Sequence, residues 1–278
     1  MDFQKSLLLG MRWIAMVSLP VWGVSSAIAA SVVTEAVGYV TIPTPVGYSL
    51  VSVPLGSKRE SPSDPGTAVK LNGGSFMGKV DSGAVLERWS VLGYTSYTFV
   101  QEAGSASGAG VWTDSEGQAA DVSLTVGEGL VLKNPGPQTS SIAVGYVRGY
   151  DESYPDNRAP VEPAAPGIYL RGSVLPTGGA FEDVMGHAPG EGDAFMRLTT
   201  AGVPLISRFT QNGWLDSFGN STPGPFFTEG QSAFFDTTGG QFQNFVLPNG
   251  NVVPESGTAV LMAGAFLLIS GFRERRKI

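Results

Sequence analysis

Four short sequence patterns occur twice along this chain, in the same order and with nearly constant spacing. The matched segments are 36–40 with 143–147, 73–76 with 178–181, 112–117 with 214–219, and 127–136 with 230–239. Their offsets are 107, 105, 102 and 103 residues, so only small gaps distinguish the two copies. A unit of about 100 residues that is used twice limits the fold to two similarly built halves.

The repeated residues are of types that shape β structure. Each matched segment contains glycine, which suits turns that need a positive φ. Phe76 and Phe181 are suited to a hydrophobic core. Trp112 and Trp214 each lie next to an Asp-Ser turn, in which the Asp side chain can bond to the backbone two residues on. The apolar triplets inside the last matched pair are expected to be central strands.

The composition of the body also favours strands over helices. Gly 38 and Pro 19 make up a fifth of the chain, and charged residues are 15%, below the ~25% of ordinary soluble domains. Apolar residues do not recur at helical spacing, whereas short β-branched and aromatic runs bounded by turn residues do. These runs are 37–42, 48–55, 94–100, 130–132, 142–147, 205–209, 233–235 and 242–247. We therefore expect a mainly β fold with two pseudo-symmetric sandwich- or barrel-like lobes, or one fused sandwich.

The first 29 residues have the parts of a secretory signal peptide. Lys5 and Arg12 supply positive charge, residues 13–24 form an apolar core, and Ala27-Ile-Ala29 supplies small residues for signal peptidase. The core is short and contains a proline, which argues against a permanent transmembrane helix. We expect residues 1–29 to be a signal helix that is removed during export.

The other end of the chain carries an uncharged run at 258–272, with four basic residues among the last six. A full membrane span needs ~20 apolar residues, but adjacent valines and the stems of long basic side chains can extend this run. Basic residues beyond such a segment normally stay on the cytoplasmic side. We expect a C-terminal transmembrane helix that leaves residues 30–252 outside the cytoplasmic membrane.

Val253-Pro254-Glu255, the apolar run and the basic end, in that order, resemble the PEP-CTERM sorting domain of Gram-negative bacteria. Ser256 stands where that family usually has a second proline. The resemblance covers about a tenth of the chain. It implies processing by an exosortase, a membrane cysteine protease and transpeptidase, and a plain C-terminal anchor is the alternative. The repeated Ala-Val-Gly-Tyr-Val segments also resemble a paralogous family of exported PEP-CTERM proteins of unknown function, which implies a β architecture and a surface role.

The predicted boundaries divide the chain into export signals and cargo. The parts are a signal peptide (1–29), β repeat 1 (30–148), a proline-rich acidic joint (149–166), β repeat 2 (167–252) and a sorting tail (253–278). Six of the 17 basic and three of the 24 acidic residues lie in the terminal parts, so the body carries 11 and 21, a net charge of −10. Such a body repels nucleic acid. The chain has no cysteine, which excludes disulfides and thiol nucleophiles.

The sequence contains no recognisable catalytic set. His187 is the sole histidine and lies in a turn-like segment without a Gly-x-Ser-x-Gly elbow. The carboxylate pairs Asp114 with Glu116 and Glu191 with Asp193 are each two residues apart, which is more typical of turns than of a glycosidase cleft. We therefore expect a protein that is not an enzyme, with a secreted hydrolase as the least favoured alternative.

Two binding functions remain open at this point. Exposed aromatic side chains can stack on sugars, and the candidates are Trp89, Tyr97, Trp112 and Trp214. Calcium prefers oxygen ligands, and the joint offers Asp151, Glu152 and Asp156, although a solvated acidic linker explains them too. No other cofactor is expected. The favoured function is an exported cell-surface or extracellular-matrix protein, partnered by signal peptidase, an exosortase-type enzyme, the membrane and extracellular polysaccharide. A carbohydrate-binding module is the alternative.

Overall fold

The computed structural model confirms a mainly β fold, with sixteen strands and one short helix in the part it describes. The described residues are 37–57, 68–73, 76–77, 80–103, 109–137, 140–147, 164–174, 178–240, 242–243, 245–251 and 253. The expected signal helix and the apolar run of the tail lie outside them. Within these residues no helix has the length and apolar character needed to cross a membrane.

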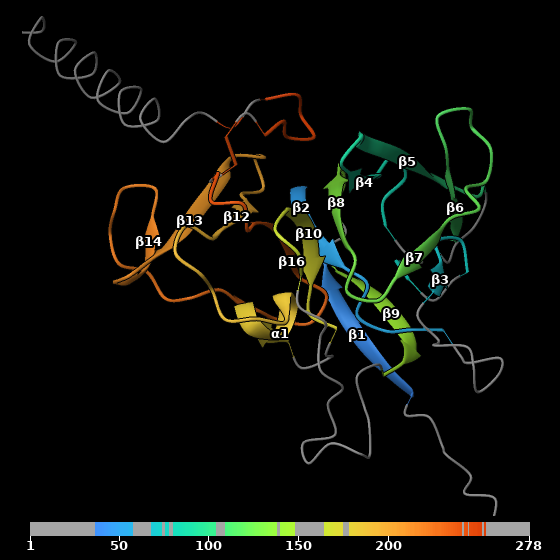
Figure 1. Ribbon diagram of the computed structural model, residues 1–278. Coiled ribbons are helices and arrows are strands. Elements are labelled where there is room, and N and C mark those ends of the chain that lie inside the picture. The colour runs from blue at the N-terminus through green and yellow to red at the C-terminus, as the bar shows by residue number, and fades with distance from the viewer. Residues whose placement is uncertain are drawn as a thin grey trace, which may run out of the picture. The chain divides into compact units, whose positions relative to one another are not determined.

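The first half of the body is built on a five-stranded antiparallel sheet with the order β2-β8-β4-β5-β6 (Figure 1). Its strands are β2 (Gly47–Ser52), β8 (Gly129–Asn134), β4 (Val85–Ser90), β5 (Gly93–Gln101) and β6 (Gly110–Thr113). A second, two-stranded sheet pairs β3 (Ala68–Lys70) with β7 (Ser123–Thr125). Val69 and Leu124 of this small sheet share one buried core with Leu86 of β4, so the two sheets pack together.

The second half has a sheet of the same order, β10-β16-β12-β13-β14. Its strands are β10 (Ile168–Gly172), β16 (Ser232–Asp236), β12 (Ala194–Leu198), β13 (Pro204–Thr210) and β14 (Gly213–Asp216). Here too a two-stranded sheet accompanies the large one, formed by β11 (Gly179–Ala180) and β15 (Phe226–Phe227). The helix α1 (Phe181–Met185) follows β11 directly and buries Phe181, Val184 and Met185.

Residues from the matched sequence segments occupy corresponding places in the two halves. Phe99 faces Trp112 across β5 and β6 with ring centroids 5.2 Å apart, and Phe209 faces Trp214 across β13 and β14 at 5.3 Å. The turns that follow the tryptophans also agree. Asp114 Oδ1 accepts backbone hydrogen bonds from residues 116 and 118, and Asp216 Oδ1 accepts them from residues 218 and 220, all at 2.9 Å.

The two Ala-Val-Gly-Tyr-Val segments pair with each other. They lie in β1 (Val37–Pro43) and β9 (Ser140–Tyr146), which form an antiparallel ribbon. In its register Gly38 is opposite Gly145, its own counterpart in the repeat. A residue that pairs with its own counterpart lies on a local two-fold axis of the antiparallel ribbon, so this axis relates β1 to β9.

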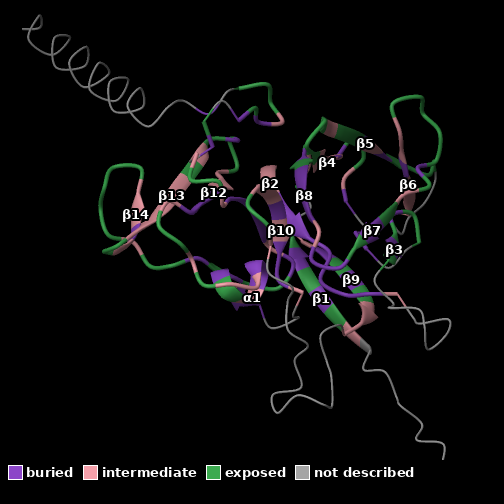
Figure 2. Ribbon diagram, viewed as in Figure 1, coloured by how far each residue is buried: buried purple, intermediate pink, exposed green. Residues whose placement is uncertain are grey.

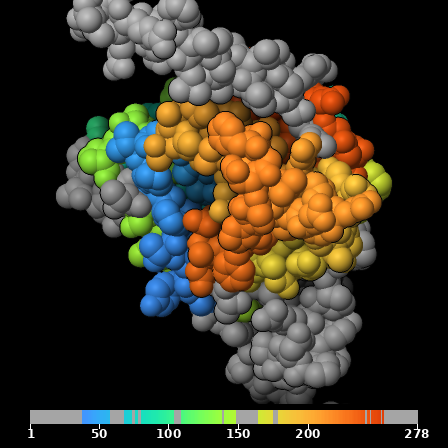
Figure 3. Space-filling view, turned by 90° about the vertical axis from the view of Figure 1, so that its left-hand side faces the viewer, coloured from blue at the N-terminus to red at the C-terminus, as the bar shows by residue number. Residues whose placement is uncertain are grey.

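A second symmetric junction joins the large sheets through their edge strands, β2 and β10. The Ser52 amide donates to the Gly230 carbonyl at 2.8 Å, and the Gly172 amide donates to the Gly127 carbonyl at 2.9 Å. Ser52 and Gly172 are equivalent positions of the two halves, and so are Gly127 and Gly230. Each half therefore donates one of the two bonds and accepts the other. Figure 3 shows the result from the side, with the blue atoms of the N-terminal strands directly beside the orange atoms of the second half.

Three buried cores stack through the body. The apolar triplet of β8 sends Leu130 and Leu132 to the first core and Val131 to a central one, where Phe234, the middle residue of the β16 triplet, also lies. Phe235 belongs to a third core on the outer side of the second sheet. Figure 2 shows buried residues concentrated where β2, β8 and β10 converge. Both triplets are therefore apolar throughout, because both faces of their strands are covered.

One predicted strand is a turn instead. The described residues of this segment, 242–243 and 245–247, belong to none of the sixteen strands. Phe242 has a φ of 63°, and its amide donates to Asp236 Oδ2 at 2.7 Å. The Phe245 amide then donates to the Phe242 carbonyl at 3.0 Å. The apolar character that suggested a strand is explained by burial, since Phe242, Phe245 and Leu247 all enter the central core.

Candidate functional site

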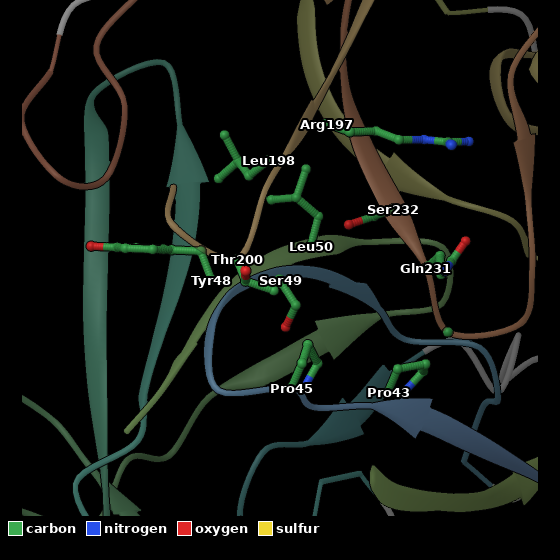
Figure 4. A pocket seen from close by; sticks show the side chains of 11 residues that line it. Pro43, Pro45, Tyr48, Ser49, Leu50, Arg197, Leu198, Thr200, Gln231 and Ser232 are labelled. Atoms are coloured by element: carbon green, nitrogen blue, oxygen red, sulfur yellow. The ribbon is translucent and has the colours of Figure 1, made fainter. Parts of the chain in front are cut away.

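A cavity of about 210 Å³ lies where the two halves meet. Three segments line it, namely the approach to β2 and its first residues (43–50), the end of β12 and its turn (197–200), and the start of β16 (230–232). In Figure 4, Arg197, Gln231 and Ser232 lie on one side of the view, and Tyr48 extends away on the other. The site therefore combines residues of the first half with residues that follow them by about 150 to 190 positions in the sequence.

Arg197 is the one cationic residue among those that line this cavity. Its Nη2 donates to the Phe226 carbonyl at 2.7 Å. Its Cζ lies 5.5 Å from the ring centroid of Phe195 and 5.0 Å from that of Phe227, so aromatic faces cover part of the guanidinium. Burial lowers the pKa of Arg197 below its ordinary value. The side chain nevertheless remains charged at any physiological pH.

The polar groups around Arg197 are neutral. Gln231 Oε1 accepts a hydrogen bond from the Thr228 amide at 3.3 Å, and Ser232 Oγ donates to the Val51 carbonyl at 2.8 Å. Ser49 Oγ is buried and has no hydrogen-bond partner among the described residues. The cavity thus combines one half-buried cation with hydroxyl and amide groups. A site of this kind can hold an anionic oxygen and satisfy further polar groups.

The four aromatic residues proposed for sugar stacking do not lie in a row. Trp112 and Tyr97 are 2% and 6% exposed in the first core, and Trp214 is 8% exposed in the third. Trp89 is half-buried and packs on Phe234 of the central core, with ring centroids 6.3 Å apart. The three buried rings contact other side chains and cannot offer a face to an external sugar in this conformation.

The proposed sorting motif begins inside the fold. Val253 is 2% exposed in the central core, and its amide donates to the Phe245 carbonyl at 2.8 Å. Pro254 and Glu255 lie outside the described residues. So do Asp151, Glu152 and Asp156, the proposed calcium ligands. In the part of the chain that is described, no three His, Cys, Asp or Glu residues are grouped as metal ligands.

The remaining sequence candidates have structural contacts. His187 Nδ1 lies 2.9 Å from the Ala188 carbonyl, and its ring packs edge-on against Phe181. Asp193 is 7% exposed and accepts the Gly190 amide at 2.8 Å within a turn. Glu191 Oε2 accepts Gln211 Nε2 at 3.1 Å. These contacts account for the two acids as turn-forming and surface groups, as they do for Asp114.

The residues that line the cavity were not found from the sequence. One signal was available, because Gln231 occupies the place of Glu128 within a matched pair of segments and so marks a lost charge. Arg197 and its counterpart in the first half, Arg88, lie outside the four matched pairs and align only through the strand registers. Comparison of the chain with protein-family models, with curated proteins and with solved structures gives no match.

Proposed function

We propose that this chain is a non-enzymatic protein of the cell surface or extracellular matrix of a Gram-negative bacterium, exported by its signal peptide and sorted through its C-terminal tail. The observation that carries the proposal is the burial of Val253, the first residue of the Val-Pro-Glu motif. The described fold ends there. A processing enzyme of the exosortase type would thus meet its motif directly at the end of the folded cargo.

The body suits such a role as a doubled β unit. The matching strand orders, the self-paired ribbon and the reciprocal junction bonds support two pseudo-symmetric lobes that share a central core. We infer a fused sandwich at the centre, with a smaller sheet against each outer face. A net charge of −10 keeps such a body soluble outside the cell and away from nucleic acid. Polysaccharide and calcium in the envelope remain candidate partners.

Processing is the step that tests this proposal. The full chain should be expressed in a bacterium that has an exosortase, and envelope and medium fractions should be analysed by intact mass. We expect a product that lacks residues 1–29 and has been cut near the Val-Pro-Glu motif. Replacing Pro254 with Ala and Glu255 with Gln together should leave the tail attached.

Ser256→Pro is the matched control, because it restores the proline usual in the PEP-CTERM motif and should leave processing intact. Full-length protein that stays soluble in the cytoplasm would contradict the export proposal. An exported protein whose tail is retained in every variant would favour a plain anchor instead.

A further inference from the structure

An arginine occurs at the same position in both halves, but its partner differs between them. Lys133 of β8 is opposite Val85, and Asp236 of β16 is opposite Ala194, so these two pairs are equivalent in the two sheets. Counting three residues on from Val85 and from Ala194 aligns Arg88 with Arg197. The same arginine therefore occurs twice, at matching places in β4 and β12.

In the first half this arginine has a carboxylate partner. Arg88 Nε donates to Glu128 Oε1 at 2.6 Å, and its Nη2 donates to Oε2 at 3.2 Å, which makes the pair bidentate. The side chain of Glu128 is only 16% exposed. Glu128 also accepts the Thr125 amide at 2.9 Å, which holds the carboxylate in place.

In the second half, a neutral glutamine stands where the first half has the glutamate carboxylate. Gln231 takes the place of Glu128, and it accepts the Thr228 amide just as Glu128 accepts that of Thr125. Within the described residues no acidic side chain forms an ion pair with Arg197. The guanidinium has five N–H donors, and one hydrogen bond, to the Phe226 carbonyl, uses a single donor.

The cavity lies at the place where the lost carboxylate leaves a positive charge unbalanced. We propose that this cavity binds a small hydroxylated organic acid, such as a hexuronic acid, whose carboxylate pairs with Arg197 as Glu128 pairs with Arg88. The side-chain amide of Gln231 would bond to the ligand's hydroxyl groups. The apolar side chains of Leu50 and Leu198 would contact its carbon skeleton.

The size and charge of the site narrow the ligand class. A cavity of about 150 Å³ can hold one benzene molecule. A volume of about 210 Å³ therefore suits one sugar-sized unit. The body has a net charge of −10, so a polyanion would be repelled as it approached. A molecule with a single carboxylate meets the local cation at the smallest electrostatic cost. Ligand binding at this cavity requires neither export nor processing of the chain.

The test is a calorimetric titration of the purified full chain with glucuronate, glucose and acetate. We expect glucuronate to bind, acetate to bind more weakly, and glucose, which has the same ring without the carboxylate, to give no measurable heat. Arg197→Gln should weaken glucuronate binding about tenfold or more, as expected when one charge-assisted pair is lost.

Gln231→Glu separates this proposal from a loss of folding. The new carboxylate should pair with Arg197, raise the thermal midpoint and weaken glucuronate binding by a similar factor. Asn212→Asp makes the same amide-to-acid change on the exposed β13–β14 turn, and it should leave binding unchanged. Equal binding of glucose and glucuronate, full binding by Gln231→Glu, or no binding by the wild type would each overturn the proposal.

Discussion

At one pair of equivalent positions, the first half has a charged residue and the second half has an apolar one. Glu87 of β4 and Met196 of β12 are equivalent, since each lies two residues beyond the aligned Val85 and Ala194. Met196 fills the central core, whereas Glu87 brings a carboxyl group towards it. Burial raises the pKa of Glu87, although Lys133 and a hydrogen bond with Ser96 oppose the shift. One of its carboxylate oxygens is buried without a hydrogen-bond partner among the described residues.

Glu87→Gln should therefore stabilise the protein at neutral pH. Because the folded-state pKa is raised, the unfolded chain loses its proton first, and Glu87 lowers the free energy of unfolding as the pH rises above about 4.3. The variant should unfold at a higher temperature than the wild type at pH 7, with a smaller difference at pH 4. Thermal unfolding at both values measures this. The same change at exposed Glu116 is the control and should show no such trend.

At the scale of packed strands, Phe234 connects the two halves. It is fully buried in β16, with its ring centroid 4.9 Å from that of Phe245 and 6.3 Å from that of Trp89 in the first sheet. Phe234→Ala should lower the free energy of unfolding by about 3–5 kcal/mol, the usual cost of removing a buried aromatic ring. Chemical denaturation is the measurement. Phe218→Ala removes a ring of 77% exposure and should cost far less.

The junction of β2 and β10 depends on the absence of a side chain at Gly172. A Cβ there would overlap the Cβ of Ser52 and the carbonyl of Gln231, so the edge strands could not stay as close. Gly172→Ala should lower the thermal midpoint and weaken protection of the Ser52 amide from exchange. Gly190→Ala is a suitable comparison, because a Cβ at that position meets nothing closer than 3.7 Å. Equal stability of the two variants would show that the junction tolerates separation.

The sequence predicted elements better than their partners. The Asp-Ser turns that follow Trp112 and Trp214 and the apolar triplets can be predicted because local residue types determine them. The pairing of β1 with β9 cannot, because alternation shows that a segment is a strand without showing which strand lies beside it. Trp112 was a sugar-stacking candidate for the same reason, since the sequence does not tell which face of β6 is covered. The cavity around Arg197 forms where the two halves meet. It could not be predicted without knowing how β2 and β10 lie against the other half.

At the scale of the whole molecule, the reciprocal junction and the central core predict one cooperative unit. Separating the halves would expose Leu50 and Val131 on one side and Phe234 on the other. We expect a single unfolding transition, with the slowest-exchanging amides of β8 and β16 opening at similar free energies. Hydrogen exchange followed by mass spectrometry measures both. Two separate transitions, or exchange confined to one half, would contradict this expectation.

The self-pairing of Gly38 with Gly145 bears on how such a molecule can arise. In a chain with only one copy of the unit, the first strand would have no partner strand to pair with in the same polypeptide. Two such chains could satisfy each other through the same ribbon, as a homodimer. The present protein is then equivalent to a dimer whose subunits have been tethered, which frees either copy to diverge while the other preserves the architecture.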